Sequence, residues 1–421
     1  MLESPLARVA VISLHTSPLD QPGVGDSGGM NVEVRALAKG LDERGAAVDV
    51  FTRCAGRGVP EIERIGPRAR VIQVQAGPCA GVDKGELPAL VPAFTQNLVR
   101  RVEELGPYDL VHAHYWLSGT AAAAAARRLE VPLFASFHTL AEVKNLALAD
   151  GDRPEPLARI AGERALIRAA DRVLAPTSEA ARQLTELYAA DPARIRVVPP
   201  GVDVERFFPR DRAQARARLG VSGSPVVLFV GRLQPLKGPD LAIRAFAEAV
   251  RTGGEAMRDA VLLMVGGPSG PLGDRVRPWL DAVAAEENVE GRVRFLPPHP
   301  HEELPWVYSA ADVLLMPSRS EAFGLAALEA QACGVPVVAS SVGGLRSAVR
   351  DGAGGSLVPA GDTRALAART VEIVSNPDLA SRLSAGAVAH AAAFPWDATV
   401  DGLLDAYAEL LGIRASRKQA V

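Results

Sequence analysis

Short apolar runs rich in β-branched residues alternate along the chain with longer segments that have helical periodicity. Between the first two runs, the segment 31–44 places Val34, Leu37, Ala38 and Leu41 on one helical face. Uninterrupted apolar strands separated by amphipathic helices are typical of a parallel sheet with helices on both faces. In the first half of the chain, the runs predict strands over Val9–Leu14, Val48–Phe51, Leu110–Ala113, Leu133–Ser136, Val173–Ala175 and Ile195–Val198.

The second half repeats this arrangement after a proline-containing connector and a charged helix predicted over Arg210–Leu219. We therefore expect an α/β protein of two Rossmann-like, doubly wound domains, with the boundary near residue 205. The polar residues 414–421 are expected to form a frayed tail. The strands predicted in the second half cover Val226–Val230, Val261–Val265, Val293–Leu296, Val313–Met316, Val335–Ala339 and Ser356–Val358.

The length of the chain agrees with two domains, and its net charge limits the kinds of molecule that it is expected to bind. A chain of 421 residues is long for a single hydrophobic core, and its formal net charge is -3. This charge provides no global field for nucleic acid or an anionic membrane, and no run of about 18 apolar residues occurs. The start of the chain also lacks the pattern of a secretory leader. We expect small-molecule substrates and a cytoplasmic location, with neither nucleic acid nor membrane as partner.

The cysteines point to the same compartment. Cys54, Cys79 and Cys333 are an odd number without close spacing. This pattern argues against a disulfide framework and against a thiolate metal site. We therefore predict three ordinary thiols in a reducing compartment.

Two cations follow the strand predicted over Val226–Val230. Arg232 and Lys237 lie five residues apart, at the edge of the sheet where open parallel sheets bind their ligands. A guanidinium fork and an ammonium group together suit a diphosphate, and can neutralise the charge that develops on it as a leaving group. The alternative is a pair of solvated side chains on a surface loop.

Two glutamates frame a predicted helix start in the second domain. Glu321 precedes Phe323, Gly324 and Leu325, where unpaired backbone N–H groups can receive phosphate oxygens. Glu329 follows after eight helical steps, which return a side chain to within about 80° of its starting direction. Glu329 stands among apolar residues, where a buried carboxylate needs a partner. The alternative is that Glu321 merely complements the helix dipole and that Glu329 is solvated.

A glycine-rich segment, 23–31, joins the first predicted strand to the first helix. Glycines such as Gly28 and Gly29 let the backbone approach a phosphate or a sugar closely. The spacing is not G-x-G-x-x-G, and no acidic residue closes a plausible second strand. An NAD(P)-dependent oxidoreductase is therefore only a remote alternative, and the segment could also be a loop without a ligand.

Four of the seven histidines stand at the ends of predicted strands: His15, His112, His114 and His138. Several histidines that converge at one edge of a sheet indicate a site. His112 and His114 could also be a zinc pair, although no cysteine or acidic ligand stands near them in sequence.

Three of these features together carry a family resemblance. Gly28-Gly29-Met30-Asn31, the segment 231–238 and the Glu321/Glu329 pair resemble retaining GT-B glycosyltransferases of the sucrose-synthase and glycogen-synthase kind. Within that group, further segments resemble the mycothiol glycosyltransferases, or D-inositol-3-phosphate glycosyltransferases, over nearly the whole chain. These segments are 15–18, 25–32, 114–119, 143–145 and 266–270.

The resemblance implies a cytoplasmic hexosyltransferase of mycothiol biosynthesis in actinobacteria. Such an enzyme transfers N-acetylglucosamine from UDP-GlcNAc to 1L-myo-inositol 1-phosphate (D-inositol 3-phosphate), retains the donor configuration and is a homodimer. No cofactor is implied, because the nucleotide sugar is a substrate. No metal is implied either, because cations and helix amides take its place at the phosphates. Residues 1–205 would bind the acceptor, completed by a C-terminal helix of about 396–413, and residues 206–395 would bind the nucleotide sugar.

The resemblance also implies a role for each matching residue. His138 would lie beside the transferred sugar, and it forms the catalytic set with Arg232, Lys237 and Glu321. Glu321 would hold the sugar hydroxyls and Glu329 the ribose. The acceptor site would be Asn31 on the inositol, with Lys84, Tyr115, Thr139 and Arg159 on its phosphate. The donor site would be Gly29, Arg232, Lys237, Glu321, Phe323, Gly324, Leu325 and Glu329.

Three positions depart from the family pattern. Family members usually have Tyr where this chain has Glu33, Tyr where it has Cys79, and Ser or another polar residue where it has Leu146. Two helical positions turn about 200°, so we expect Glu33 to point away from Asn31 into solvent. The alternative function is that of a paralogue in secondary metabolism, which would use another nucleotide sugar and a different small acceptor, such as the thiol ergothioneine. Lys84 and Arg159 together favour an acceptor that carries a phosphate.

Overall fold

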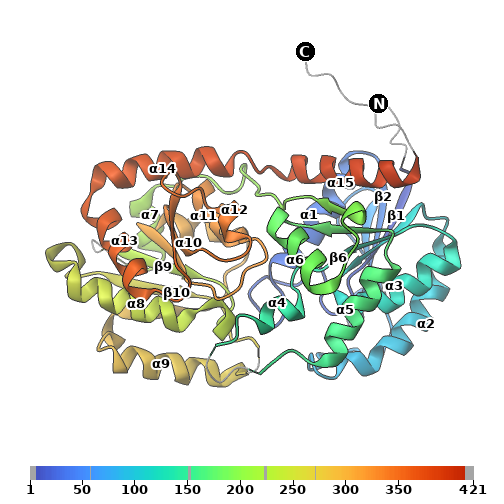
Figure 1. The fold of residues 1–421 in the computed structure, drawn as a ribbon, viewed down its shortest axis with the longest axis horizontal. Coiled ribbons are helices and arrows are strands. Elements are labelled where there is room, and N and C mark those ends of the chain that lie inside the picture. The colour runs from blue at the N-terminus through green and yellow to red at the C-terminus, as the bar shows by residue number, and fades with distance from the viewer. Residues whose placement is uncertain (1–5, 57, 150–152, 222–224, 271, 413–421) are drawn as a thin grey trace, which may run out of the picture.

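A computed structural model describes residues 6–412, apart from residues 57, 150–152, 222–224 and 271. Two α/β lobes lie side by side, and Figure 1 shows the N-terminal lobe in blue to green beside the C-terminal lobe in yellow to red. The predicted tail over 414–421 lies outside the described residues.

The N-terminal sheet has eight strands in the order β3-β4-β2-β1-β5-β6-β7-β8. Every neighbouring pair is parallel except β3–β4. The six predicted strands are present, but β3 and β4 were missed, because β3 is wholly exposed and polar residues interrupt β4. The strands are β1 (Arg8–Ile12), β2 (Ala47–Arg53), β3 (Ile62–Arg64), β4 (Ala69–Val74), β5 (Leu110–His114), β6 (Leu133–Ser136), β7 (Arg172–Ala175) and β8 (Ile195–Val197).

Helices cover both faces of this sheet, as the apolar strands predicted. In β1, Val9 and Val11 pack on the face covered by α1, whereas Ala10 and Ile12 pack on the face covered by α2 and α3. Helix α1 buries all four residues of its predicted apolar face. The helices are α1 (Gly29–Glu43), α2 (Leu87–Leu105), α3 (Trp116–Leu129), α4 (Ala141–Asn145), α5 (Leu157–Ala169) and α6 (Ser178–Tyr188).

The C-terminal sheet has six parallel strands in the order β11-β10-β9-β12-β13-β14. They are β9 (Val226–Val230), β10 (Val261–Val265), β11 (Val293–Leu296), β12 (Val313–Met316), β13 (Val337–Ser340) and β14 (Gly355–Val358), at the predicted places within two residues. Its helices are α7 (Arg212–Arg218), α8 (Pro239–Thr252), α9 (Val276–Glu286), α10 (Leu304–Ser309), α11 (Leu325–Ala332), α12 (Leu345–Ala348), α13 (Thr363–Ser375) and α14 (Pro377–Ala391).

The last helix, α15 (Trp396–Leu411), returns to the N-terminal lobe, as Figure 1 shows. Val400 and Tyr407 join the core beneath α1, and Arg44 of α1 forms ion pairs with Asp397 and Asp401. Gly40 of α1 leaves room for this contact, since a Cβ there would lie 2.4 Å from Val400 Cγ2. The chain therefore crosses between the lobes twice.

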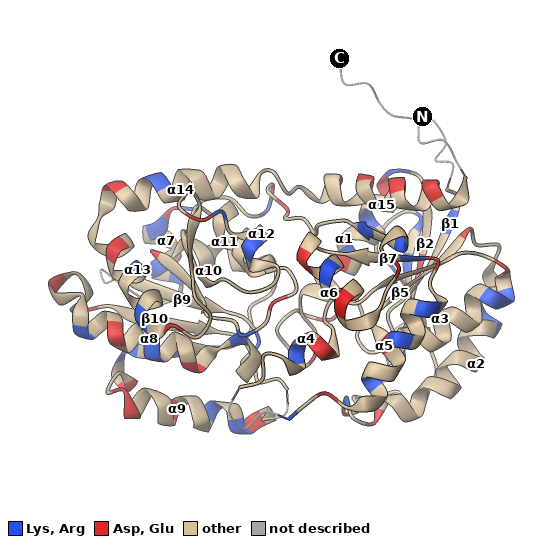
Figure 2. Cartoon of the chain, viewed as in Figure 1, with Lys and Arg blue, Asp and Glu red and all other residues tan. Residues whose placement is uncertain are grey.

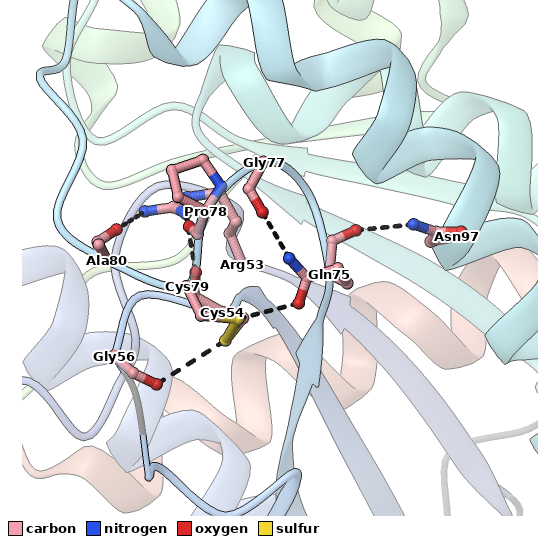
Figure 3. Close-up of a disulfide and its surroundings, with 9 residues drawn as sticks. All are labelled: Arg53, Cys54, Gly56, Gln75, Gly77, Pro78, Cys79, Ala80 and Asn97. Atoms are coloured by element: carbon pink, nitrogen blue, oxygen red, sulfur yellow. Dashed lines mark hydrogen bonds between the residues drawn. A yellow bond between two sulfur atoms is a disulfide. The ribbon is translucent and has the colours of Figure 1, made fainter.

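The prediction that Cys54 and Cys79 are free thiols is wrong, because the two residues form a disulfide (Figure 3). Cys54 follows β2 and Cys79 lies beyond the end of β4, and these strands are paired neighbours. Their Cα atoms are 5.0 Å apart although 25 residues separate them in sequence. Strand order, which the cysteine spacing does not reveal, brings them together. Cys333 is a buried free cysteine, and burial raises the pKa of its thiol.

Charges of both signs are interspersed over the outer helices (Figure 2). Within the described residues, no helix has the length and apolar character needed to span a bilayer.

Candidate active site at the domain interface

Two helix N-termini meet where the lobes face each other. Gly29 is the first residue of α1 and Leu325 is the first residue of α11. A Cβ on Gly29 would lie 3.2 Å from Leu325 Cδ1, so the two ends are nearly in contact. Each N-terminus presents backbone N–H groups and a partial positive charge. Where the two N-termini converge, they form a region of positive potential that suits the oxygens of a diphosphate.

The cations Arg232 and Lys237 line the same cleft. Both are partly buried in the segment that follows β9, and Arg232 reaches across to the N-terminal lobe, where its Nη1 lies 3.7 Å from Asp26 Oδ1. Lys237 Nζ donates to Glu321 Oε2 at 2.6 Å. These contacts argue against two freely solvated surface cations. They place two positive charges beside the paired helix ends.

The backbone of Glu321 rests on a glycine pair. Gly343 has a φ of 43°, and a Cβ there would lie 2.1 Å from the Glu321 carbonyl oxygen. The Gly344 N–H donates to that oxygen at 2.9 Å. A side chain at either glycine would displace Glu321 from the cleft, so the pair fixes the position of this carboxylate.

Glu329 is buried and fully partnered, which excludes the solvated alternative. His301 Nε2 lies 2.7 Å from its Oε1, and the Tyr308 hydroxyl donates to its Oε2 at 2.8 Å. Burial, followed by the charge of Glu329, raises the pKa of Tyr308 well above its ordinary value, so the hydroxyl stays a donor. His301 was not singled out from sequence, although it belongs to the run Pro298-His299-Pro300-His301 at the cleft.

On the opposite side, the structure brings the four predicted phosphate-binding residues together. They line a cavity of about 910 Å³ that also reaches Arg232 and Lys237. The Lys84 ammonium lies 5.3 Å from the centre of the Tyr115 ring, and the Arg159 guanidinium lies 5.0 Å from it. Arg159 Nη2 donates to Thr139 Oγ1 at 3.0 Å. Four separate segments therefore supply one cationic, aromatic wall.

Arg159 is anchored more firmly than Lys84. It is buried, and it pairs with Glu155 at 2.9 Å and with the fully buried Glu163 at 2.8 Å. Lys84 is exposed and approaches Asp26 at 3.5 Å. One cation is thus part of the core of the domain, whereas the other stands on the loop before α2.

The segment that carries Lys84 is held by the disulfide and by Arg53. The Arg53 guanidinium donates to the carbonyl oxygens of Cys54, Pro78 and Ala80 at 2.7–2.8 Å (Figure 3). The bonds to Pro78 and Ala80 do not involve sulfur, so they attach the segment to β2 independently of the disulfide.

Removal of the disulfide is therefore expected to cost stability more than activity. Closing a loop of this length stabilises a protein by about 3 kcal/mol, so Cys54→Ser/Cys79→Ser should unfold at lower denaturant concentration than the oxidised protein. Its KM for the acceptor should change little, because Arg53 still holds the segment. Denaturant unfolding with and without dithiothreitol measures this. An identical midpoint for the reduced and oxidised forms would contradict it.

Three of the histidines at the strand ends, His112, His114 and His138, lie next to one another. His112 forms two hydrogen bonds. Its Nδ1 lies 2.7 Å from the Tyr407 hydroxyl, and its Nε2 lies 2.9 Å from Ser136 Oγ. Burial lowers the pKa of His112 to about 3, so it is neutral. His114 Nδ1 lies 2.9 Å from His138 Nε2. The geometry does not support a zinc pair, because no group of three or more His, Cys, Asp or Glu residues in the described part of the chain could hold a metal.

Two further residues belong to the side of the cleft where the acceptor is predicted to bind. His15 lines the cleft, and its buried Nδ1 has no hydrogen-bond partner among the residues that the structure describes. Burial, followed by the charge of Lys84, lowers the pKa of His15. A neutral imidazole with a free nitrogen suits a ligand hydroxyl. Asn31 is buried, and its amide accepts from Gly28 N at 2.9 Å and donates to Ser17 O at 2.5 Å. Asn31 thus shapes the loop in addition to its predicted role.

The prediction that Glu33 points to solvent is wrong. Glu33 lines the cleft, its side chain is 17% exposed, and its Oε2 lies 3.5 Å from His138 Nδ1. Glu33 follows Gly29 by four residues, so the two lie on the same face of α1. That face looks into the cleft. Leu146, another departure from the family pattern, is 77% exposed.

Comparison with known proteins gives a match for each lobe. Residues 28–201 match the glycosyl transferase 4-like domain, and residues 211–389 match glycosyl transferases group 1. The D-inositol 3-phosphate glycosyltransferase of Nocardia farcinica is 50% identical over 96% of this chain and 90% of its own length. The protein of the same name from Geodermatophilus obscurus is 52% identical over 95% of this chain and 89% of its own.

Among solved structures, sucrose-phosphate synthase from Thermosynechococcus elongatus has a TM-score of 0.88 at 32% identity, covering 96% of this chain and 99% of that one. Anabaena Alr3699/HepE in complex with UDP and glucose has a TM-score of 0.74 at 21% identity, covering 96% and 99%, and shows the fold alone.

The two facing Rossmann-like lobes, with a cationic cleft between them, are those of a GT-B glycosyltransferase, as the sequence predicted. Within that class, the chain belongs to the family of D-inositol 3-phosphate glycosyltransferases. An NAD(P)-dependent oxidoreductase is thereby excluded.

Proposed function

We propose that this chain transfers N-acetylglucosamine from UDP-GlcNAc to D-inositol 3-phosphate (1L-myo-inositol 1-phosphate), with retention, in mycothiol biosynthesis. The observation that carries the proposal is the cavity of about 910 Å³ in which Lys84, Tyr115, Thr139 and Arg159 stand beside Arg232 and Lys237. Such an arrangement suits two phosphorylated substrates bound next to each other. The relatives that share half of this sequence are named for that acceptor.

The donor diphosphate would bind at the paired N-termini of α1 and α11, between Arg232 and Lys237. As the glycosidic bond breaks, negative charge grows on the diphosphate, and these groups stabilise it where it develops. Glu321 lies 2.6 Å from Lys237, so it stands beside the leaving group and within reach of the sugar hydroxyls. Glu329, already held by His301 and Tyr308, would accept the ribose hydroxyls.

The acceptor would approach the same face of the sugar that the diphosphate leaves. Lys84 and Arg159 would grip its phosphate, and Asn31 and His15 would face the inositol ring. In a front-face transfer, the departing phosphate oxygen takes the proton of the attacking hydroxyl. No carboxylate nucleophile is then needed, and the product keeps the α configuration of the donor.

A direct assay tests the proposal. Purified protein is incubated with UDP-GlcNAc and D-inositol 3-phosphate, and UDP release is followed. Replacement of the acceptor by ergothioneine or unphosphorylated inositol, and of the donor by UDP-glucose, tests the paralogue alternative. Faster turnover with ergothioneine than with inositol phosphate would refute the proposal.

The stereochemistry of the product is a separate prediction. An anomeric proton coupling constant typical of an α linkage is expected in the NMR spectrum of the purified product. A β-linked product would rule out retention, and a trapped glycosyl adduct of Glu321 would favour a double displacement instead.

We also propose a cytoplasmic homodimer. Substrates that carry several negative charges do not cross membranes, so the enzyme would work where they are made. Cytoplasmic thiols keep most disulfides reduced, and thiol labelling of Cys54 and Cys79 in intact cells would report on their state there. Leu146 and Leu157, 77% and 82% exposed, are apolar surface that a second copy would cover. Elution of the purified protein as a monomer would refute the dimer.

A further inference from the structure

The carboxylate of Glu33 stands at one end of a chain of three side chains in the cleft. Its Oε2 lies 3.5 Å from His138 Nδ1, and His138 Nε2 lies 2.9 Å from His114 Nδ1. The side chains of Glu33 and His138 are 17% and 14% exposed, and His114 is buried. The rings of His114 and His138 are stacked, with centroids 5.1 Å apart. Both ring nitrogens of His138 thus face a polar group of the protein.

The backbone also holds His138 in an unusual position. Its φ is 59°, in the left-handed region that residues other than glycine seldom adopt. The residue lies two positions after the end of β6, where the chain turns toward α4. A strained backbone of this kind persists only when its surroundings hold it, and such positions gather at functional sites.

The proton positions in this chain follow from chemistry. An ionised carboxylate is only an acceptor, so Glu33 selects an N–H at Nδ1 of His138. In the neutral ring, Nε2 of His138 then has a lone pair, and His114 Nδ1 must donate to it. His114 can do so while neutral, because burial lowers its pKa well below the ordinary value.

We propose that Glu33 is a positioning residue of the active site, whose carboxylate fixes the ring orientation and the tautomer of His138. The carboxylate holds the imidazole at the cleft wall, where it borders the space for the transferred sugar. Glu33 acts on the reaction through His138 and makes no contact with the reacting atoms. The link to sugar transfer rests on the proposed function, whereas the contact between Glu33 and His138 does not.

The helix that carries Glu33 also carries the donor contact. Gly29, which begins α1 beside Leu325 of α11, lies one helical turn before Glu33. A rigid helix therefore couples the place of the diphosphate to the place of the imidazole. The leaving group and the sugar must be aligned for transfer, and residues on one face of α1 help to position both.

The test combines kinetics with NMR of the histidine rings. Glu33→Leu removes the acceptor, whereas Glu33→Gln keeps an acceptor oxygen without the charge. In Glu33→Leu, kcat is expected to fall about ten- to hundredfold. This is the range found in metalloenzymes when the hydrogen-bond partner that orients a metal-binding histidine is removed. KM for the sugar nucleotide should stay within about twofold, and Glu33→Gln should recover part of the loss.

Glu43→Leu is the matched control, because Glu43 lies on the same helix, is exposed and pairs with Lys39 at 3.6 Å. It should leave kcat unchanged.

The ring tautomer is read from ¹⁵N-histidine-labelled free enzyme, with His138→Asn used to assign the signals. Wild type should show His138 protonated at Nδ1, and Glu33→Leu should shift the proton toward Nε2. A fall in kcat without any change in the His138 ring signals would mean that Glu33 acts on the substrate directly, and would overturn the proposal. Unchanged kcat with unchanged signals would do so too. Because the NMR needs no substrate, it decides the contact even if wild type fails to glycosylate inositol phosphate. If Glu33→Leu does not fold, Glu33→Gln decides by the same measurements.

Discussion

Replacement of Arg232 or Lys237 by Ala is expected to lower kcat by roughly a hundredfold or more, the scale seen when one preorganised donor to a developing charge is removed. Both cations stand beside the converging N-termini of α1 and α11, where, on the proposed function, charge would grow on the diphosphate as the glycosidic bond breaks. Interactions that strengthen in the transition state raise kcat, whereas interactions equal in the ground state alter only binding. The affinity for the donor should therefore change less than kcat.

Steady-state kinetics, with titration calorimetry for donor affinity, separates the two effects. Arg258→Ala is a suitable control, because Arg258 is an exposed cation of the same lobe that pairs with Glu255. Wild-type turnover with weaker donor binding in the Arg232 and Lys237 variants would refute the leaving-group role. Lys237→Ala also frees Glu321 from its 2.6 Å partner, so Arg232 gives the simpler result.

Replacement of Lys84 by Ala is expected to raise KM for inositol phosphate by about ten- to a hundredfold and to leave KM for UDP-GlcNAc nearly unchanged. A hydrogen bond to a charged group contributes about 1.5–3 kcal/mol, and Lys84 is an exposed cation on a loop whose other contacts remain. The variant should discriminate less between phosphorylated and unphosphorylated inositol. Lys39→Ala, which removes an exposed lysine of α1, provides the control. An equal rise in both KM values would contradict the assignment.

Arg159 needs a different variant, for a reason that the sequence did not show. Its guanidinium neutralises Glu163, which is fully buried, and removal of one partner of a buried pair costs about 3–5 kcal/mol. An Arg159→Ala protein would lose stability together with acceptor binding. Arg159→Lys keeps the charge but not the planar fork, so it separates the two effects better.

The fold class and the family could be predicted from the sequence, because both depend on local signals. The apolar runs have the length of buried strands, and the glycines, cations and glutamates follow them at the carboxyl edge. Strands β3 and β4 were missed for the same reason, since the exposed Ile62–Arg64 and the interrupted Ala69–Val74 lack a continuous apolar pattern. Their membership in the sheet depends on the partner strand β2.

Glu33 shows the limit of reasoning from helical angle. Its direction relative to Asn31 was estimated correctly at about 200°, but Asn31 turns its amide into the loop, toward Gly28 and Ser17. The face that looks into the cleft begins at Gly29 and continues to Glu33. A helical angle gives the side chains relative directions only, and packing decides which direction is inward.

Apart from β3 and β4, the sequence by itself determined the succession of strands, the two-domain organisation and the types of side chain at the strand ends, because each of these depends on residues near one another in the chain. The tertiary structure alone decided which distant residues meet. The order of strands joined Cys54 to Cys79 across 25 residues, the return of α15 brought Tyr407 to His112, and the docking of the lobes set Arg232 beside Asp26. Such contacts depend on the packing of whole layers, which no local pattern of apolar and polar residues contains.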